Sequence, residues 1–383
     1  MKRRLLVLST YPEISADARF RAVAYFQHLE AAGIQCDFAP FCDADFLRMI
    51  HRPGRRVRKA FDLARFSLAR LGVLLRGGRY DAVFVQREAA LIGPALVESV
   101  LATILDVPLV YDLDDAIWLD ATQATGVSAS AHPLARRLLK VPSKTDRLLQ
   151  MATTVVAGSS FLATYARRFN SDVAIVPTVV SRERWHPLPG RLDGRMLNEA
   201  VPTIGWIGSH STAVQLDLVV LALQRLAREG NKFRVRIIGS TRRLPIEGVD
   251  CENPRWSLER EIEDFQTIDI GLAPMFANEW GEGKCGFKQI QYMAVGVPMV
   301  TSLVGGARDF VVDGTNALVA HDDEAWYRHL KTLLDERSVR ARLAREGRAL
   351  VEQRLCTEVQ ADRIVSIVDA AMRRSHAPVS RGP

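Results

Sequence analysis

The sequence predicts an α/β protein built from two doubly wound domains, each with a parallel sheet covered by helices on both faces. Short apolar runs alternate with helix-period segments in the first half of the chain, the alternation stops at residues 181–202, and it then resumes. Short buried strands that alternate with helices are typical of parallel sheets. The length of 383 residues is also comfortable for two domains.

The strand and helix segments divide the chain into two halves. In the first half we expect strands at 4–9, 34–39, 81–86, 108–113, 153–158 and 172–177, and helices near 19–32, 57–76, 94–106, 133–150 and 160–169. In the second half we expect strands at 203–209, 234–239, 269–274 and 297–302, and helices near 212–229, 257–265, within 281–300, and at 322–335, 337–353 and 357–373. Residues 181–202 combine proline, glycine and charge without a period, which predicts a linker. The expected organisation is therefore a first domain at 1–180, the linker, a second domain at 203–356, a last helix at 357–373 and a flexible tail at 374–383.

Composition excludes several classes of protein. With 48% hydrophobic and 25% charged residues, the chain has an ordinary globular composition. No apolar run approaches the about 18 residues of a transmembrane helix, and the run at residues 5–8 is too short for a signal peptide. The five cysteines lack the spacing of a zinc site, so we expect reduced thiols and a cytoplasmic location.

The net charge of +7 is concentrated in one stretch. Residues 48–79 contain ten lysines and arginines and one acidic residue, Asp62. Apolar residues recur there every three or four positions, which predicts an amphipathic helix whose apolar face packs on the first domain: Phe61, Ala64, Leu68, Leu71 and Leu75. The charge density also indicates contact with an anionic membrane surface. Nucleic acid is the other anionic partner, but no nucleic-acid-binding module is recognisable, so we expect none.

Loops after strands are the expected ligand sites in doubly wound sheets. The first of them, STYPEISADARFR, has no glycine, which argues against a dinucleotide-binding turn. Arg19 and Arg21 open the next helix and could bind phosphate, or could form a solvated first turn. In VYDLDDAIW, Asp112, Asp114 and Asp115 could hold a divalent ion, cap the next segment, or bind an arginine or a sugar hydroxyl. The rest of a metal shell is missing nearby, so we expect no metal.

Two loops of the second half could contact a ligand. GWIGSHST places Ser209, Ser211 and Thr212 before a helix, where they could cap it or, with Gly208, receive a phosphate. In ENPRWSLERE, Trp256 could support a nucleobase or belong to the core.

The stretch GEGKCGFKQIQYMAVGVPMV, at residues 281–300, combines a glycine-rich loop with a short helix. Lys284 and Lys288 supply positive charge, and Lys288 shares a helix face with Gln291. A lysine suits a phosphate, and an amide suits a neutral hydroxyl beside it. Three glycines would let the backbone approach a ligand: Gly281, Gly283 and Gly286. The stretch therefore predicts a site for a phosphate-bearing ligand.

Five segments, in this order, resemble the bacterial group 1 glycosyltransferases of family four, which have the GT-B fold: RFRAVAYFQHLEAAGI, VYDLDDAIW, VAGSSFLATYARRF, IGWIGSHST and GKCGFKQIQYMAVGVPMV. The resemblance implies a retaining transfer of a sugar from a nucleotide diphosphate sugar. It implies a donor mostly on the second domain, an acceptor on the first, and a last helix that crosses back to the first domain. Helix amides and lysines would hold the diphosphate charge, so we expect no metal or other cofactor.

The sequence departs from the family pattern at two places. The second Glu of the motif Glu, seven residues, Glu falls on Gln291, which can still bind a ribose hydroxyl, and the first falls on Gly283, with Glu282 one position early. The usual Arg/Lys pair after the first strand of the second domain is replaced by SHST. The diphosphate charge would then fall to Lys284, Lys288 and Arg19 or Arg21.

The candidate site residues form three groups. We assign a catalytic role to Lys288, Lys284 and Arg19. We assign donor binding to Gly208, Ser209, Ser211, Thr212, Arg255, Trp256, Gly286, Phe287 and Gln291, and the acceptor side to Arg21, Glu88, Asp112, Asp114 and Asp115.

The functional hypothesis is a glycosyltransferase that uses a saccharide or lipid-linked acceptor in cell-surface polysaccharide or glycoconjugate synthesis, at the inner face of the cell membrane. Two alternatives remain open. One is a nucleotide-sugar 2-epimerase of the same fold. The other is a catalytically silent sugar- or nucleotide-binding protein, favoured if Gly283 replaces an essential carboxylate.

Overall fold

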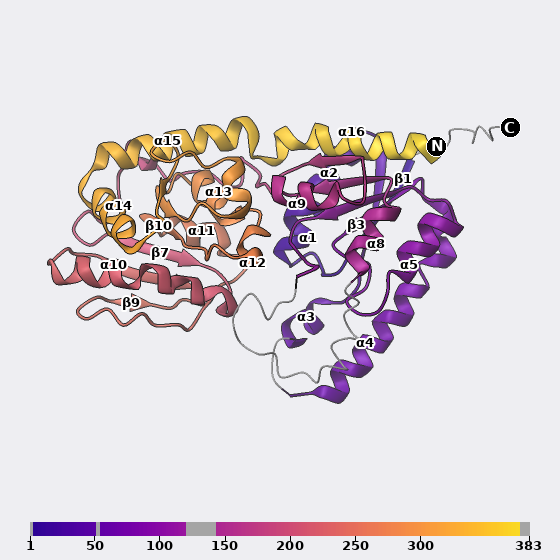
Figure 1. The fold of residues 1–383 in the computed structure, drawn as a ribbon, viewed down its shortest axis with the longest axis horizontal. Coiled ribbons are helices and arrows are strands. Elements are labelled where there is room, and N and C mark those ends of the chain that lie inside the picture. Colours follow the sequence, from indigo (N-terminus) through magenta and orange to yellow (C-terminus); the bar gives the residue numbers. More distant parts are fainter. Residues whose placement is uncertain (1–2, 51–53, 120–142, 376–383) are drawn as a thin grey trace. The chain divides into compact units, whose positions relative to one another are not determined.

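The computed structural model describes residues 3–50, 54–119 and 143–375, which form two compact units (Figure 1). The first unit contains the described residues up to 178 together with 360–375, and the second contains 179–359. Each unit is built on a six-stranded sheet in which every pair of neighbouring strands is parallel. The predicted α/β class with two parallel sheets is therefore confirmed.

The sheet of the first unit has the strand order β2-β1-β3-β4-β5-β6. Its strands are β1 (Arg3–Ser9), β2 (Ile34–Pro40), β3 (Ala82–Gln86), β4 (Leu109–Leu113), β5 (Thr154–Ala157) and β6 (Val173–Ile175). All six expected strands are confirmed to within two residues at either end. Their apolar runs form the core of the sheet, where Leu5, Val83 and Val110 are buried.

The helices of the first unit include one that the sequence analysis missed, α3 (Ala44–Ile50). The others are α1 (Ala16–Arg21), η1 (Val23–Tyr25), α2 (Phe26–Ala31), α4 (Arg56–Leu71), η2 (Leu74–Arg79), α5 (Leu96–Ser99), η3 (Val100–Ile104), α8 (Lys144–Met151), α9 (Ser160–Ala166) and α16 (Thr357–Ser375). Part of the helix expected at 133–150 lies outside the described residues. In α16, Asp369 pairs with Arg3, and Arg374 pairs with Asp172 at 2.7 Å, which anchors residues 360–375 in the first unit.

Helix α4 packs on the first unit through the opposite face from the one that we expected. On α4, Phe61 is 68% exposed and Leu68 is 72% exposed. Leu75, which follows the helix, is 89% exposed. The buried face instead carries Phe66 and Arg70. Phe66 packs against two other rings, with its centroid 6.0 Å from that of Phe41 and 5.3 Å from that of Phe46. The predicted packing of the Phe61–Leu75 face was wrong, because this aromatic cluster of the first unit occupies the inner side of the helix.

The sheet of the second unit has the order β12-β11-β10-β7-β8-β9. Its strands are β7 (Thr203–Ile207), β8 (Arg234–Ile238), β9 (Cys251–Glu252), β10 (Ile270–Ala273), β11 (Met299–Thr301) and β12 (Leu318–Val319). The four expected strands are confirmed to within two residues, and the two edge strands that were missed have only two residues each. Its helical segments are η4 (Arg191–Asp193), η5 (His210–Leu216), α10 (Asp217–Arg228), α11 (Glu261–Gln266), α12 (Glu279–Glu282), α13 (Phe287–Ala294), η6 (Gly305–Asp309), α14 (Asp323–Asp335) and α15 (Arg337–Arg354).

Residues 181–202, expected as a linker, fold as part of the second unit. Arg191 pairs with Asp269 at 2.6 Å, and both side chains are buried. The ring of Trp185 lies 5.3 Å from that of Phe265. These buried side chains pack the segment onto the second unit. A segment without helix or strand periodicity is therefore not necessarily an extended linker. None of the described helices has the length and apolar character needed to span a membrane.

Candidate functional site

Three loops of the second unit meet at the carboxyl ends of its strands. Gly208, after β7, donates its amide to Ile238 O at 3.1 Å, and Gly239, after β8, donates to Pro254 O at 3.1 Å. Gly239 has φ 85°, and a Cβ added to it would stand 2.5 Å from Gly208 O. Glycine is required there because both the backbone conformation and the close approach exclude a side chain. The loop after β7, the loop after β8 and residues 253–256 therefore form one continuous edge.

Trp206 links this edge to α13 and was not singled out from the sequence. It lies on β7 and is buried. Lys288 Nζ lies 4.1 Å from the centroid of its ring, and a Cβ added to Gly208 would stand 2.5 Å from its ring atoms. The GWIG segment could have suggested this arrangement, because an aromatic residue two positions before a loop glycine faces the same side of the sheet as that glycine. Trp206 thus brings Lys288 to the loop that begins at Gly208.

Lys288 carries a charge that its surroundings do not balance. Burial lowers the pKa of its ammonium group to about 7. Within the described part of the chain, no carboxylate lies at ion-pair distance from its Nζ. The Trp206 ring stabilises the charged form only modestly. A phosphate group beside Nζ would supply the missing anion, so this side chain is suited to a phosphate-bearing ligand.

Helix α13 is buried at every residue from Gln289 to Ala294, so burial alone does not separate its two predicted faces. Ile290, Met293 and Ala294 are buried. Lys288 and Gln291 are one turn apart on the same helix. Gln291 is buried, with 7% of its surface exposed. The neighbouring amide, Gln289, is structural, because it donates to Thr301 Oγ1 at 3.0 Å.

The hydroxyl groups after β7 bond to one another. Ser209 Oγ lies 3.0 Å from Ser211 Oγ and 3.1 Å from Thr212 Oγ1, and Thr212 Oγ1 donates to Ser209 O at 3.0 Å. Ser209 stands at the N-cap of η5 without a side-chain capping bond. Ser209 and Ser211 are exposed, so their hydroxyls can still reach a ligand. These contacts fit both interpretations, a local turn network and a phosphate-binding loop.

Trp256 is 39% exposed, so the core alternative is wrong for this residue. Its Cβ would lie 3.4 Å from a Cβ added to Gly239, which locates it on the same edge as Gly208. Asn253 fixes the loop by donating to Ser240 O at 2.9 Å and Arg242 O at 2.7 Å. The neighbouring Arg255 is exposed. A flat ring and a guanidinium group are thus presented together after β9.

The glycine-rich loop packs on another loop of the protein. A Cβ on Gly286, which has φ 71°, would stand 2.9 Å from Ala307 N, and one on Gly281 would stand 2.2 Å from Phe276 O. These glycines are therefore required by contacts within the unit, whereas we had expected them to admit a ligand. Glu282, one position before Gly283, pairs with Arg308 and accepts the Gly305 amide at 3.1 Å. Lys284 Nζ lies 4.1 Å from the centroid of Trp280, and Phe287, the first residue of α13, is half-buried.

In the first unit, Arg21 and Asp112 form a buried ion pair. Arg21 Nε donates to Asp112 Oδ2 at 3.1 Å, Nη1 donates to Val176 O at 2.6 Å, and both side chains are almost fully buried. Arg19 and Arg21 lie in the last turn of α1, so the expectation that they open the helix was wrong. Arg19 is half-buried, with its guanidinium 4.6 Å from the Phe20 ring centroid. Arg21 and Asp112 hold α1, β4 and the residue that follows β6 together, and we no longer expect them to contact an acceptor directly.

Arg87 organises the acidic residues after β4, and the sequence analysis missed it. Its guanidinium bonds to Asp17 at 2.5 Å, Asp114 at 3.0 Å and Asp115 at 2.9 Å. Of the alternatives for Asp114 and Asp115, binding to an arginine is the one observed. Burial raises the pKa of the Asp114 carboxyl to about 7, with Asp17, Asp112 and Asp115 adding to the effect and Arg87 opposing it.

The backbone at Arg87 and the neighbouring residue complete this cluster. Arg87 has φ 63°, which is unusual for a residue with a side chain, and it directly follows β3. A charged residue immediately after a buried strand was the signal that could have identified it. Glu88 Oε1 lies 3.7 Å from Lys144 Nζ. Among the described residues, no three His, Cys, Asp or Glu side chains gather as they would around a metal ion.

The two parallel α/β units define the GT-B class of fold, and the candidate site residues lie at the carboxyl ends of their strands. Residues 201–336 match the family model described as glycosyl transferases group 1, which confirms the resemblance found in the sequence. Over 192 residues the chain is 21% identical to the capsular polysaccharide biosynthesis glycosyltransferase CapM of Staphylococcus aureus. This match covers 47% of the chain and 49% of CapM, so the chain spans about half the length of this curated relative.

Solved structures extend the similarity over both units. The crystal structure of Anabaena HepE in complex with UDP and glucose has a TM-score of 0.67 at 14% identity, covering 97% of this chain and 100% of HepE. WaaG, a glycosyltransferase involved in lipopolysaccharide biosynthesis, has a TM-score of 0.58 at 12% identity, covering 95% of this chain and 99% of WaaG. At these identities the similarity establishes the fold, which is the predicted GT-B fold.

Proposed function

We propose that the chain is a retaining glycosyltransferase that moves a sugar from a UDP-sugar to a saccharide or lipid-linked acceptor. The observation that carries this proposal is Lys288, a partly buried cation that lies against Trp206 without a carboxylate partner among the described residues. It belongs to the segment that matches the group 1 family model. HepE, whose whole length is covered by the structural similarity, was crystallised with UDP and glucose, which supports uracil as the base of the donor.

In the proposed reaction, Lys288 neutralises the diphosphate, which gains negative charge as the bond to the sugar breaks. Fixed donors aimed at developing charge typically contribute about 3 kcal/mol each. Gln291, one turn further along α13, binds the ribose hydroxyls, and Trp256 supports the base. The exposed Ser209 and Ser211 hydroxyls and the Gly208 amide are available for the phosphate oxygens. Lysine and backbone amides supply the positive charge, so the proposed reaction needs no metal.

The proposed acceptor contact lies in the first unit, at the cluster around Arg87. Asp114 and Asp115 accept hydrogen bonds, and the raised pKa of Asp114 lets its carboxyl also donate one near neutral pH. Groups of this kind suit sugar hydroxyls. CapM and WaaG, named for capsular polysaccharide and lipopolysaccharide synthesis, support a role in cell-surface polysaccharide or glycoconjugate synthesis.

We further propose that α4 holds the protein on the inner face of the cell membrane. Its outward face carries apolar side chains, among them Phe61 and Leu68. The exposed Arg55, Arg56 and Arg58 stand at its start. Apolar side chains flanked by cations are typical of helices that lie in the interface of an anionic membrane.

The test is donor turnover by the full chain with UDP, GDP, TDP and ADP sugars, each with and without saccharide and lipid-linked acceptors. We expect acceptor-dependent release of UDP with the anomeric configuration retained. Lys288→Ala should retain the fold and lose at least tenfold in turnover, and Lys232→Ala, at an exposed position of the second unit, is the control for removal of a lysine. Wild-type turnover in Lys288→Ala, or UDP release that never depends on an acceptor, would contradict the proposal; the second result would favour the epimerase.

A further inference from the structure

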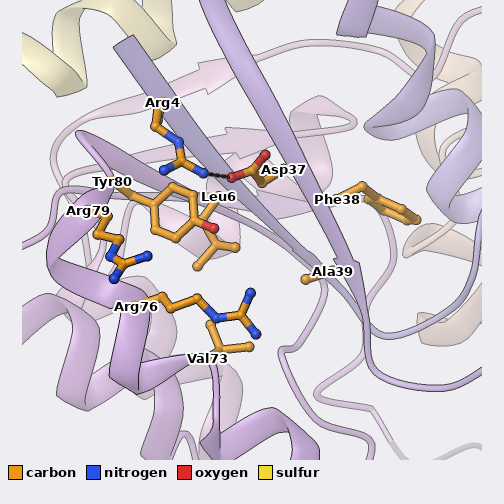
Figure 2. Close-up of a pocket in the computed structure, with 9 residues that line it drawn as sticks. All are labelled: Arg4, Leu6, Asp37, Phe38, Ala39, Val73, Arg76, Arg79 and Tyr80. Carbon is orange, nitrogen blue, oxygen red and sulfur yellow. Dashed lines mark hydrogen bonds and ion pairs between the residues drawn. The ribbon is translucent and has the colours of Figure 1, made fainter. Parts of the chain in front are cut away.

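A pocket in the first unit lies apart from the loops described above. It has a volume of about 380 Å³ and opens between β1, β2 and η2 (Figure 2). Its lining contains three arginines and one carboxylate, together with a tyrosine and an apolar wall: Arg4, Arg76, Arg79, Asp37, Tyr80, Leu6, Phe38, Ala39 and Val73. We propose that this pocket binds the phosphate group of a small phosphate ester or of a phospholipid headgroup.

The charge of the pocket is the first argument. Asp37 is the only acidic side chain of the lining, and Arg4 pairs with it. Burial, and the nearby Asp37 carboxylate, raise the pKa of the Tyr80 phenol. Arg4 lies with its guanidinium 5.0 Å from the Tyr80 ring centroid. Asp37 is therefore already engaged by Arg4 and has little capacity left to balance another cation.

Arg76 and Arg79 are the uncompensated charges. Neither makes an ion pair or a side-chain hydrogen bond to another described residue. Three guanidinium groups against one carboxylate leave the lining with a net charge of about +2. Figure 2 shows the side chains of Arg76 and Arg79 on the η2 side of the Tyr80 ring and the Arg4–Asp37 pair on its other side. An anion between Arg76 and Arg79 would balance the pocket.

Geometry favours phosphate over a simple halide. Guanidinium groups present several N–H donors in a planar fork, which matches the oxygens of a phosphate. Arg76 and Arg79 are three residues apart on η2, a 3₁₀ segment in which such side chains are aligned. Leu6, Ala39 and Val73 form an apolar wall that suits the carbon part of an ester. The volume is within the range of small-molecule sites.

The pocket is distinct from the site around Arg87. Arg4 is the second residue of β1, and Tyr80 precedes β3, so these residues lie toward the amino ends of the strands. Arg87 and Asp114 follow the carboxyl ends of β3 and β4. The pocket proposal goes beyond the proposed transfer reaction and does not depend on it. Arg76 is adjacent in sequence to Leu75, which is 89% exposed, so a lipid headgroup is as accessible a source as a soluble ester.

The experiment is calorimetric titration of the full chain with glycerol 3-phosphate at constant ionic strength. We expect saturable binding that weakens at least tenfold in the double variant Arg76→Gln/Arg79→Gln. The control is Arg147→Gln/Arg167→Gln, which removes the same charge from exposed positions elsewhere in the first unit. Thermal unfolding of both variants checks the fold. No saturable binding by the wild type, or equal loss in both double variants, would overturn the pocket.

Vesicles distinguish the source of the phosphate. Binding to phosphatidylcholine vesicles containing phosphatidic acid is measured for the same proteins. Two results together identify a lipid headgroup. Arg76→Gln/Arg79→Gln loses more vesicle binding than the control variant does, and glycerol 3-phosphate competes with the vesicles for the wild type. Equal vesicle binding in both double variants, with glycerol 3-phosphate binding lost only in the first, identifies a soluble ester. The assay contains no nucleotide sugar, so failure of the proposed transfer activity would leave its outcome unaffected.

Discussion

Lys288 is partly buried, and its ammonium group is held against the Trp206 ring. Burial without a carboxylate partner among the described residues brings its pKa to about 7, far below the ordinary value of 10.5. In the free protein near neutral pH, the lysine is therefore only partly charged. A bound diphosphate favours the charged form and raises this pKa again. Protonation of one side chain is thus linked to donor binding.

This linkage predicts proton uptake on binding of UDP-glucose, whose diphosphate does not itself titrate near neutral pH. At pH 8, one unit above the free pKa of about 7, most Lys288 is neutral, so binding should take up close to one proton. At pH 6 the lysine is already charged and uptake should approach zero. Above pH 7 the affinity should fall by up to about tenfold per pH unit, or ~1.4 kcal/mol. Calorimetry in buffers of different ionisation enthalpy measures the protons directly.

Lys288→Met is the control for this experiment, because it keeps the length and removes the titrating group. It should bind UDP-glucose weakly and without the pH-dependent uptake. Uptake that persists in Lys288→Met would assign the proton to another group, and wild-type affinity in this variant would leave Lys288 without a part in donor binding.

Gln291 provides a second prediction at the residue scale. Its amide is 7% exposed on the helix face that it shares with Lys288. Gln291→Glu should change the affinity for UDP by no more than about tenfold, because the carboxylate accepts the ribose hydroxyls more strongly but repels the diphosphate. Gln291→Leu should weaken binding more, because hydroxyls would face a group that cannot bond. Equal affinity for the wild type and the Leu variant, measured by calorimetry, would leave Gln291 with a structural role only.

At the scale of elements, the exposed face of α4 is the clearest departure from expectation. A periodic apolar stripe predicts a helix but does not say which neighbour covers the stripe. In α4 the buried side is formed by Phe66 and Arg70, and Arg70 donates a hydrogen bond to Ser9 O at 3.3 Å. The stripe that carries Phe61 and Leu68 stays exposed, beside a dense group of arginines.

This face predicts binding to anionic vesicles with an apolar component. Phe61→Ser/Leu68→Ser should weaken the partition coefficient at least tenfold at constant lipid charge, since burying each large apolar side chain contributes roughly 1.5–3 kcal/mol. Reversing Arg55, Arg56, Arg58 and Lys59 to Glu should release the protein and spare transfer to a soluble acceptor. The matched control is Leu221→Ser/Val312→Ser, which changes two exposed apolar residues of the second unit. Sedimentation with vesicles gives the partition coefficient.

Two results would contradict this role of α4. One is the absence of vesicle binding by the wild type at low salt, where attraction to anionic lipid is strongest. The other is an equal loss in the α4 variant and in its control, which would indicate a general effect of apolar-to-polar substitution.

The elements that could be predicted share one property: their signals are local. The strands and α13 were predicted because apolar runs and helix periods are written in consecutive residues. Strands β9 and β12 were missed because two residues cannot show a period. Arg87 was missed because its partners, Asp17 and Asp114, come from segments 70 and 27 residues away. Likewise, Gly286 was assigned to a ligand because its neighbour, Ala307, is known only from the fold.

At the scale of the whole molecule, arginines hold the carboxylates of the candidate sites. Asp112 is paired with Arg21, Asp114 and Asp115 with Arg87, and Glu282 with Arg308. A divalent ion at any of these places would have to displace a guanidinium group from its carboxylate. For the buried pair of Arg21 and Asp112, such a break typically costs about 3–5 kcal/mol. The positive charge that a diphosphate needs is instead available from Lys288.

These pairs predict that donor turnover does not depend on a divalent metal. EDTA should leave the wild-type rate unchanged, and added Mg²⁺ or Mn²⁺ should not raise it. The structural reason concerns both units: the acidic residues that might bind the ion are already engaged by Arg21, Arg87 and Arg308. Turnover that is lost with EDTA and restored by either metal would contradict this view of Asp114 and Asp115. If turnover of the wild type, but not of Asp114→Asn/Asp115→Asn, depended on the metal, the ion would lie at the cluster around Arg87. If the turnover of both proteins depended on the metal, the ion would lie elsewhere.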